Sequence, residues 1–269
     1  MDIFSAIILG VVQGATEFLP VSSTGHLILA HSVLGIAGGN ALAFDAILHL
    51  ATALAVVVYF FDDIWLLIQT VLRKLGRLPI NEKDMTLVWA LIVGTIPGVV
   101  FGLLLESTME TVFRNPLLVA ATLVAGSVLF IFAEYKYQNS LHAGSVDIKT
   151  GLKIGFFQSL ALIPGVSRSG ASIVGGMLLG LTREEATRFA FLLAIPIILG
   201  AGSKKLLELI SSGGDVVWAP VIVGAVVAFV VGLAAIHFMI TFVKQHTLWP
   251  FIWYRIILAA FVVFVVFFG

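Results

Sequence analysis

Long uncharged stretches separated by short charged connections dominate the chain. A transmembrane helix needs roughly 20 predominantly apolar residues, so stretches of this kind predict membrane-crossing helices, some of which include polar flanking residues. We therefore predict an all-α polytopic membrane protein with six transmembrane helices. The six stretches are Ala46–Phe61, Thr86–Leu105, Pro116–Ala133, Phe189–Ser203, Val216–Val243 and Ile256–Gly269, the last approached from Trp249.

Four other apolar segments are too short to cross a bilayer. Three of them hold 14 uncharged residues each, which as a helix span about 21 Å of a hydrocarbon core roughly 30 Å thick. These three are Ile3–Thr16, Ile154–Ser167 and Ser169–Thr182, and a fourth piece runs from His26 to about Leu34. Short helices joined by Pro/Gly breaks predict two re-entrant hairpins, which are tolerated at membrane depth only where protein or a water-filled cavity surrounds them.

The two interrupted regions resemble each other at an offset of 145 residues. Gly10-Val-Val-Gln13 matches Gly155-Phe-Phe-Gln158, and the segment from Pro20 to Gly25 matches that from Pro164 to Gly170 with only the proline displaced. Each half is thus predicted to hold one hairpin and three spans, as repeat 1 (about 1–136) and repeat 2 (about 148–269) of a single membrane domain, 1–269. Because three is an odd number, the halves would enter the membrane from opposite sides, as an inverted-topology repeat.

Basic residues predict the orientation, because cytoplasmic loops carry an excess of Lys and Arg. In this topology only Arg114, Lys204 and Lys205 fall on the opposite side, and both termini are expected to be extracytoplasmic. The predicted cytoplasmic set, which begins with a loop over Asp62–Asp84, is Arg73, Lys74, Arg77, Lys83, Lys136, Lys149, Lys153, Arg183, Arg188 and Lys244.

Composition agrees with a lipid environment. Hydrophobic residues make up 60% and charged residues 11% of the chain, whereas a soluble domain carries about 25% charged residues. Lys+Arg and Asp+Glu both number 15, so no excess of positive charge indicates nucleic acid as a partner. The absence of cysteine excludes disulfides, thiolate catalysis and Cys-ligated metals. The N-terminus lacks the basic region of a signal peptide, so we expect the first apolar segment to be part of the mature protein.

Polar residues at the first break form a candidate phosphate site. Gln13 and Glu17 are spaced i,i+4 and share one helix face, although such a pair could simply join two helices. Ser22-Ser23-Thr24-Gly25-His26 then begins a new half-helix, whose free N–H groups and positive dipole end favour an anion. Ordinary N-capping is the simpler reading, but a single serine would satisfy it.

The second break places a cation between two hydroxyl groups, in the sequence Ser167-Arg168-Ser169-Gly170. A guanidinium offers a planar fork of donors suited to phosphate oxygens. If the two hairpins meet, the cavity holds a nucleophile, a base, a carboxylate for metal or proton handling, and a cation, which are the parts that phosphoryl transfer requires. A structural ion pair between Arg168 and Glu17 is the alternative, and it is compatible with function.

Other features favour structural roles. Gly94, Gly98 and Gly102 form a small-xxx-small stripe that predicts a close helix contact. Trp249, Trp253 and Tyr254 are expected to form an interfacial belt with Arg255 snorkelling to water. His49 would either be structural or line the cavity, and Glu106, Glu110 and Glu134 are expected to be solvated near span ends.

These residues resemble the bacterial undecaprenyl-diphosphatase, or bacitracin-resistance, family over nearly the whole chain. Two motifs carry the resemblance: Gln13-x-x-x-Glu17 running into Pro20-x-Ser-Ser-Thr-Gly-His26, and Pro164-Gly-x-Ser-Arg-Ser-Gly170. The resemblance implies hydrolysis of undecaprenyl diphosphate, a cell-wall carrier lipid, to its monophosphate and phosphate. It also implies a divalent cation, Mg²⁺ or Ca²⁺, and a bacterial inner-membrane location with an extracytoplasmic active site. Gln13 stands where some members have glutamate, which removes one possible metal ligand.

By the same resemblance, Glu17, Ser23, His26 and Arg168 are the expected catalytic residues. The expected phosphate contacts are Ser22, Thr24, Gly25, Ser167, Ser169 and Gly170, and Gln13 joins Glu17 in the metal or polar cavity.

Several alternatives remain open at this point. Ser23 attacks phosphorus with help from Glu17 or His26, or His26 is itself the nucleophile and Ser23 positions the substrate. A polyprenyl-phosphate transporter or flippase is the rival function, since inverted repeats with broken helices are transporter architecture. A purely structural scaffold fits poorly with Arg168 and Glu17 at the breaks. The sequence leaves open whether the chain forms a homodimer.

Overall fold

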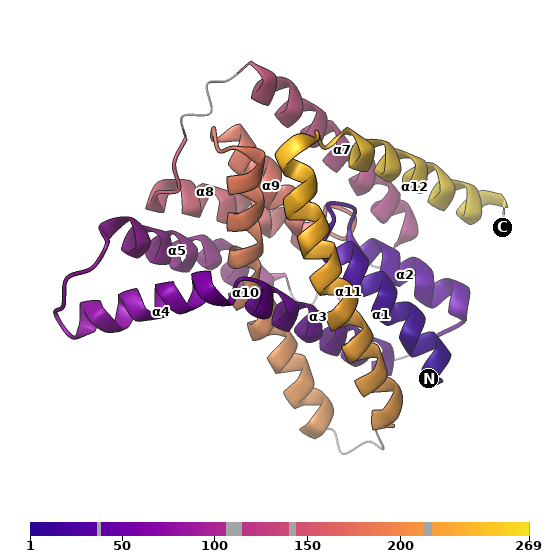
Figure 1. The fold of residues 1–269 in the computed structure, drawn as a ribbon. Helices are drawn as coiled ribbons and strands as arrows, with labels where there is room; N and C mark the ends of the chain where they lie inside the picture. Colours follow the sequence, from indigo (N-terminus) through magenta and orange to yellow (C-terminus); the bar gives the residue numbers. More distant parts are fainter. Residues whose placement is uncertain (37–38, 106–114, 140–143, 212–216, 269) are drawn as a thin grey trace.

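The computed structural model describes residues 1–36, 39–105, 115–139, 144–211 and 217–268, and its regular elements there are all helices (Figure 1). The elements are α1 (Ile3–Phe18), α2 (Ser23–Leu34), α3 (Gly39–Tyr59), α4 (Phe61–Leu75), α5 (Glu82–Leu104), α7 (Pro116–Gln138), α8 (Ile148–Ser159), the 3₁₀ turn η2 (Leu160–Leu162), α9 (Arg168–Leu178), α10 (Arg183–Ser211), α11 (Trp218–Gln245) and α12 (Trp249–Phe268).

Helices that could cross a membrane are numerous, as the apolar pattern predicts. Among the described residues, α5, α7, α10, α11 and α12 are each long and apolar enough to do so. Helices α3 and α4 meet the same test only as a pair, and they are bent by 78° at the break between them. The prediction of an all-helical, multi-pass membrane protein is confirmed, with five to six candidate spans.

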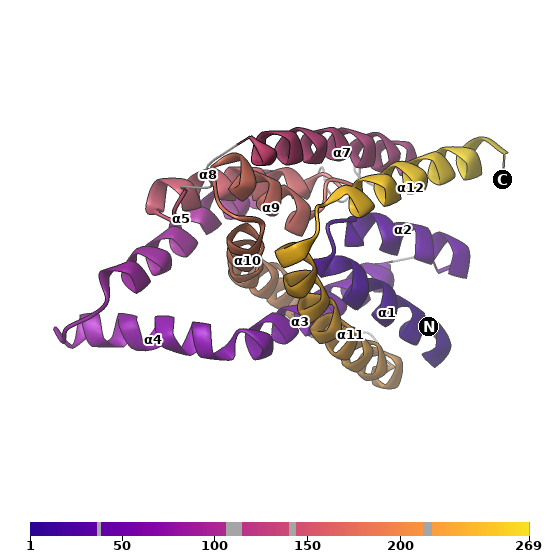
Figure 2. The same ribbon diagram turned by 45° about the horizontal axis from the view of Figure 1, so that its top comes forward.

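The expected loop over Asp62–Asp84 is wrong for most of its length, because α4 occupies Phe61–Leu75. The reason lies in the spacing of its exposed apolar side chains, which recur at helical intervals of three and four residues. These side chains are Phe61, Trp65, Ile68, Leu72 and Leu75. Figures 1 and 2 show α4 and α5 together as an arm that extends from the body of the molecule.

The short segments form helix–break–helix units, although their bounds differ from the prediction. Helix α1 ends at Phe18, and α2 follows after a four-residue break. Helix α8 begins at Ile148 because the Asp147 side chain caps it by accepting from Thr150 N. The expected half-helix over Ile154–Ser167 is wrong beyond η2, since residues 163–167 lead as a loop into α9. Glycine and proline explain this early end, because Pro164 lacks an amide hydrogen and Gly165 has φ +94°.

The offset of 145 residues reappears in the backbone. Helix α2 begins at Ser23 and α9 begins at Arg168. The preceding residues, Ser22 and Ser167, both have φ 75°, and their side chains accept hydrogen bonds from the amides of Gly25 and Gly170. The two breaks therefore share one local conformation.

Close glycine contacts join the two halves. Helix α1 packs on α11, and α8 packs on α5, as Figures 1 and 2 show for both pairs. A Cβ atom added to Gly155 would lie within clashing distance of Gly94 O, and one added to Gly14 would lie 2.6 Å from Ala228 O. The predicted contact at Gly94 and Gly98 is thus confirmed, whereas a Cβ on Gly102 would meet nothing nearer than 4.0 Å.

Glu134 corrects another expectation, because it is fully buried and not solvated. Its carboxylate accepts from Arg183 Nε at 3.0 Å and from Leu248 N at 2.8 Å. A cation and a backbone amide therefore replace the water that a carboxylate needs. Glu106 and Glu110 lie outside the described residues.

The contact between α8 and α5 makes a stability prediction. Gly155→Ala should lower the free energy of unfolding by about 1–3 kcal/mol, because overpacked contacts force backbone shifts. Gly200→Ala is the matched control: a Cβ there meets nothing within 4 Å, and alanine is the better helix former by about 1 kcal/mol. Unfolding in detergent, followed by circular dichroism, measures both variants. Equal stability of the two variants would contradict the close contact.

Candidate active site

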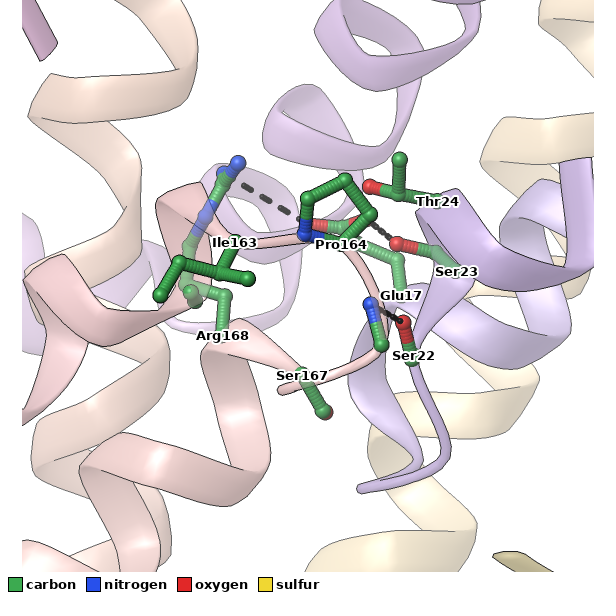
Figure 3. Close-up of a pocket in the computed structure, with 10 residues that line it drawn as sticks. Glu17, Ser22, Ser23, Thr24, Ile163, Pro164, Ser167 and Arg168 are labelled. Carbon is green, nitrogen blue, oxygen red and sulfur yellow. Dashed lines mark hydrogen bonds and ion pairs between the residues drawn. The ribbon is translucent and has the colours of Figure 1, made fainter. Parts of the chain in front are cut away.

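The two helix breaks meet, and a pocket lies between them (Figure 3). It contains about 250 Å³ of free space, including its open mouth. Helices α2 and α9 both begin at this point, and the first N–H groups of a helix have no acceptor within it. The pocket is therefore suited to an anion. It is lined by Glu17, Ser22, Ser23, Thr24, Ala161, Ile163, Pro164, Gly165, Ser167 and Arg168.

Backbone and hydroxyl groups connect one break to the other. The buried Ser22 Oγ accepts from Gly165 N at 3.1 Å as well as from Gly25 N at 3.4 Å. In the opposite direction, Ser169 Oγ donates to Leu19 O at 3.2 Å. These reciprocal hydrogen bonds fix the distance between the two loops.

Glu17 is the centre of the polar network. Its Oε2 atom accepts from Ser23 Oγ at 2.6 Å and from Gln13 Nε2 at 2.9 Å. His49 Nδ1 lies 3.1 Å from the same oxygen and 2.6 Å from Gln13 Nε2. A buried carboxylate that accepts a serine proton is the arrangement of a general base with its nucleophile.

Arg168 faces the other oxygen of this carboxylate. Its Nη1 atom lies 3.5 Å from Glu17 Oε1, and Figure 3 shows the guanidinium directed toward Glu17 across the pocket. Nη1 is buried, yet it has no hydrogen-bond partner among the described residues. The guanidinium can therefore donate to an anion in the pocket while it remains paired with Glu17.

His26 points to a different part of the molecule. Its Nδ1 atom lies 2.7 Å from Ser22 O, and its Nε2 atom lies 2.7 Å from the Tyr254 hydroxyl, against which the ring stacks. A carbonyl only accepts, so Nδ1 carries the proton and Nε2 accepts from the tyrosine. Both imidazole nitrogens are thus occupied by contacts that position the ring, and His26 does not line the pocket.

The remaining expected site residues are divided between the pocket and its supports. Thr24 is exposed at the pocket, and Ser167 lines it with its side chain directed away from Glu17 in Figure 3. Gly25 and Gly170 donate their amides to the capping serines. Their catalytic and phosphate-binding roles stay predictions.

Sequence reasoning missed Arg255. Predicted to snorkel, it is instead completely buried, and it donates to the carbonyls of Pro20 and Gly165, one on each break. The signal was present, because a single arginine stands directly before a long uncharged stretch. An arginine within an apolar helix is a functional candidate by default, because its burial is costly.

Comparison with known proteins places the chain in a family. Residues 6–261 match the family described as bacitracin resistance protein BacA. The undecaprenyl-diphosphatase of Chloroherpeton thalassium is 41% identical over 97% of this chain and 95% of its own length. Those of Trichlorobacter lovleyi and Kineococcus radiotolerans are 42% and 44% identical, each over 95% of this chain and over 94% and 91% of their own lengths. The chain belongs to the bacitracin resistance protein family.

Proposed function

We propose that this protein hydrolyses undecaprenyl diphosphate to undecaprenyl phosphate and inorganic phosphate. The observation that carries the proposal is the contact of Ser23 with Glu17, opposite Arg168, in a pocket where two helices begin. The names of the relatives support this substrate and favour hydrolysis over the flippase alternative. The helices that are long and apolar enough to cross a membrane indicate a lipid environment, which a polyprenyl tail requires.

Nucleophilic attack by Ser23 is the mechanism that the geometry favours. Glu17 takes the hydroxyl proton as Ser23 Oγ attacks the terminal phosphorus, and the bond to the bridging oxygen breaks. Arg168 and the N–H groups of α2 and α9 stabilise the charge on the phosphate oxygens. Water then attacks the phosphoserine and releases phosphate. His26 supports this site by holding Ser22 O from the outside of the pocket.

A divalent cation fits the pocket only together with substrate. The described residues contain no cluster of three or more His, Asp or Glu side chains that could hold a metal alone. Glu17 offers one carboxylate, and Gln13 Oε1 is a buried oxygen without a hydrogen-bond partner there. Mg²⁺ is commonly held by one or two carboxylates and substrate phosphates, so we propose Glu17 as its protein ligand in the pocket. Gln13 does not line the pocket and would support Glu17 from behind through its hydrogen bond. When bound, the cation would neutralise charge on the diphosphate.

The fine architecture and orientation are also proposals. We propose that α1–α2 and α8–α9 are re-entrant hairpins of an inverted repeat with six spans, which the shared break conformation supports. The pocket would then open to the extracytoplasmic side of a bacterial inner membrane, where it meets the lipid's diphosphate. A homodimer stays a prediction.

Phosphate release tests the proposed activity directly. Purified protein with Mg²⁺ should release phosphate from a C55 or C15 prenyl diphosphate, and EDTA should abolish the release. Arg168→Ala should reduce kcat about 10³-fold, because a cation opposite transferring phosphate contributes on this order. Arg188→Ala is the control, since that arginine pairs with Asp63 away from the pocket. Folded protein that binds the lipid without releasing phosphate would favour the flippase.

The nucleophile can be identified by comparing Ser23→Ala with His26→Ala. Ser23→Ala should reduce kcat by about 10³-fold or more, because removal of a nucleophile ends covalent catalysis. His26→Ala should cost about tenfold or less, and Tyr254→Phe should resemble it, because both variants break the same contact. Rapid acid quench should trap acid-stable phosphoserine. Acid-labile phosphohistidine, with an inactive His26→Ala, would instead make His26 the nucleophile.

Cysteine labelling tests the orientation, since the chain contains no cysteine. A membrane-impermeant maleimide added to intact spheroplasts should label Thr24→Cys, an exposed position at the pocket. It should label Lys74→Cys only after the cells are opened. The reverse pattern would place the pocket on the cytoplasmic side.

A further inference from the structure

Arg255 on α12 makes an unusual set of contacts. Its side chain is completely buried, and within the described part of the chain all its hydrogen bonds end on uncharged oxygens. The six acceptors are Pro20 O at 3.3 Å, Thr122 O at 3.4 Å, Leu123 O at 3.2 Å, Ser127 Oγ at 3.3 Å, Gly165 O at 3.0 Å and Val166 O at 3.1 Å.

These acceptors belong to three separate parts of the fold. Pro20 lies in the first break, and Gly165 and Val166 lie in the second. The other three acceptors lie on α7, which runs beside α12. One guanidinium therefore joins both breaks to a helix pair that does not line the pocket. Its planar fork of five N–H donors allows this, whereas a lysine ammonium has only three.

The direction of these carbonyls matters for phosphate binding. Carbonyl oxygens carry negative partial charge, and any that turned into the pocket would repel a diphosphate. Arg255 draws the carbonyls of Pro20, Gly165 and Val166 toward itself. Each lies within three residues of Ser23 or Arg168 along the chain.

We propose that Arg255 is a positioning residue that fixes both breaks in the conformation that binds the diphosphate. The proposal rests on the proposed function and adds to it a residue that touches neither phosphate nor nucleophile. Thr122 assists from α7, since its hydroxyl donates to Pro164 O. Displacement of a reacting group by about 1 Å can cost on the order of 10²-fold in rate, so loosened breaks should lower turnover even in a folded protein.

Arg255→Lys is the first test, with Arg183→Lys as its matched control. Arg183 is also an arginine with little exposure, but it pairs with Glu134 away from the pocket. Per folded molecule, Arg255→Lys should lower kcat about 10–100-fold while KM for the prenyl diphosphate changes less than about threefold. Arg183→Lys should melt earlier and retain its kcat per folded molecule.

Hydrogen exchange supplies a readout that general destabilisation would not produce. In Arg255→Lys, peptides covering 19–25 and 163–170 should lose amide protection, whereas peptides from α10 and α11 should not. Ser127→Ala provides a milder variant that leaves the arginine in place, and it should lower kcat a few-fold by removing the acceptor of Arg255 Nε.

Three outcomes would overturn the proposal. The first is an unchanged kcat per folded molecule in both Arg255→Lys and Ser127→Ala. The second is a loss of kcat per folded molecule in Arg255→Lys that Arg183→Lys shows to the same extent. The third is a lower kcat in Arg255→Lys without any change in hydrogen exchange at the breaks. If Arg255→Lys does not fold, kcat and exchange in Ser127→Ala decide the matter. Wild-type protein that releases no phosphate would contradict the proposed function, and exchange at the breaks would still test the positioning role of Arg255.

Discussion

Backbone groups freed at the two helix breaks need partners from within the protein, because apolar surroundings offer none. The breaks satisfy this need partly through each other. Ser22 accepts from Gly165 N, and Ser169 donates to Leu19 O. Arg255 donates to further carbonyls on both sides. The pocket and the first turns of α2 and α9 lie where this exchange holds the two breaks together.

The same constraint explains how an anion site can exist in so apolar a chain. Burying a charge costs several kcal/mol unless it is paired, and the pocket contains opposite charges on Glu17 and Arg168. Two helix beginnings add N–H groups whose positive ends face the same space. In the proposed site, an entering phosphate would exchange its water for these donors beside the contact of Glu17 with Ser23.

Much of this arrangement could be predicted from the sequence. The short helices, the two breaks and the offset of 145 residues follow from hydrophobic length and from Pro, Gly and Ser positions, which are local signals. Burial of Glu134 could not be predicted, because its partner Arg183 lies 49 residues away. For Arg255 the sequence carries a signal, but its partners lie 89 or more residues away, so they could not be identified. The orientation of His26 was unpredictable for the same reason: its proximity to Ser23 in sequence gave no sign of Tyr254, 228 residues distant. Helix α4 was missed although its amphipathic spacing is local, because its charges were interpreted as a loop.

The two breaks share the backbone conformation of Ser22 and Ser167, but they carry different functional side chains. At the offset of 145 residues, Ser23 corresponds to Arg168, and Glu17 corresponds to Leu162. One half supplies the hydroxyl and the carboxylate, and the other supplies the cation. The proposed reaction centre thus resembles a heterodimer interface folded into a single polypeptide. Substitutions that make the two halves more alike would remove one of these groups from the proposed site, so a sequence designed toward symmetry is expected to lose the proposed activity.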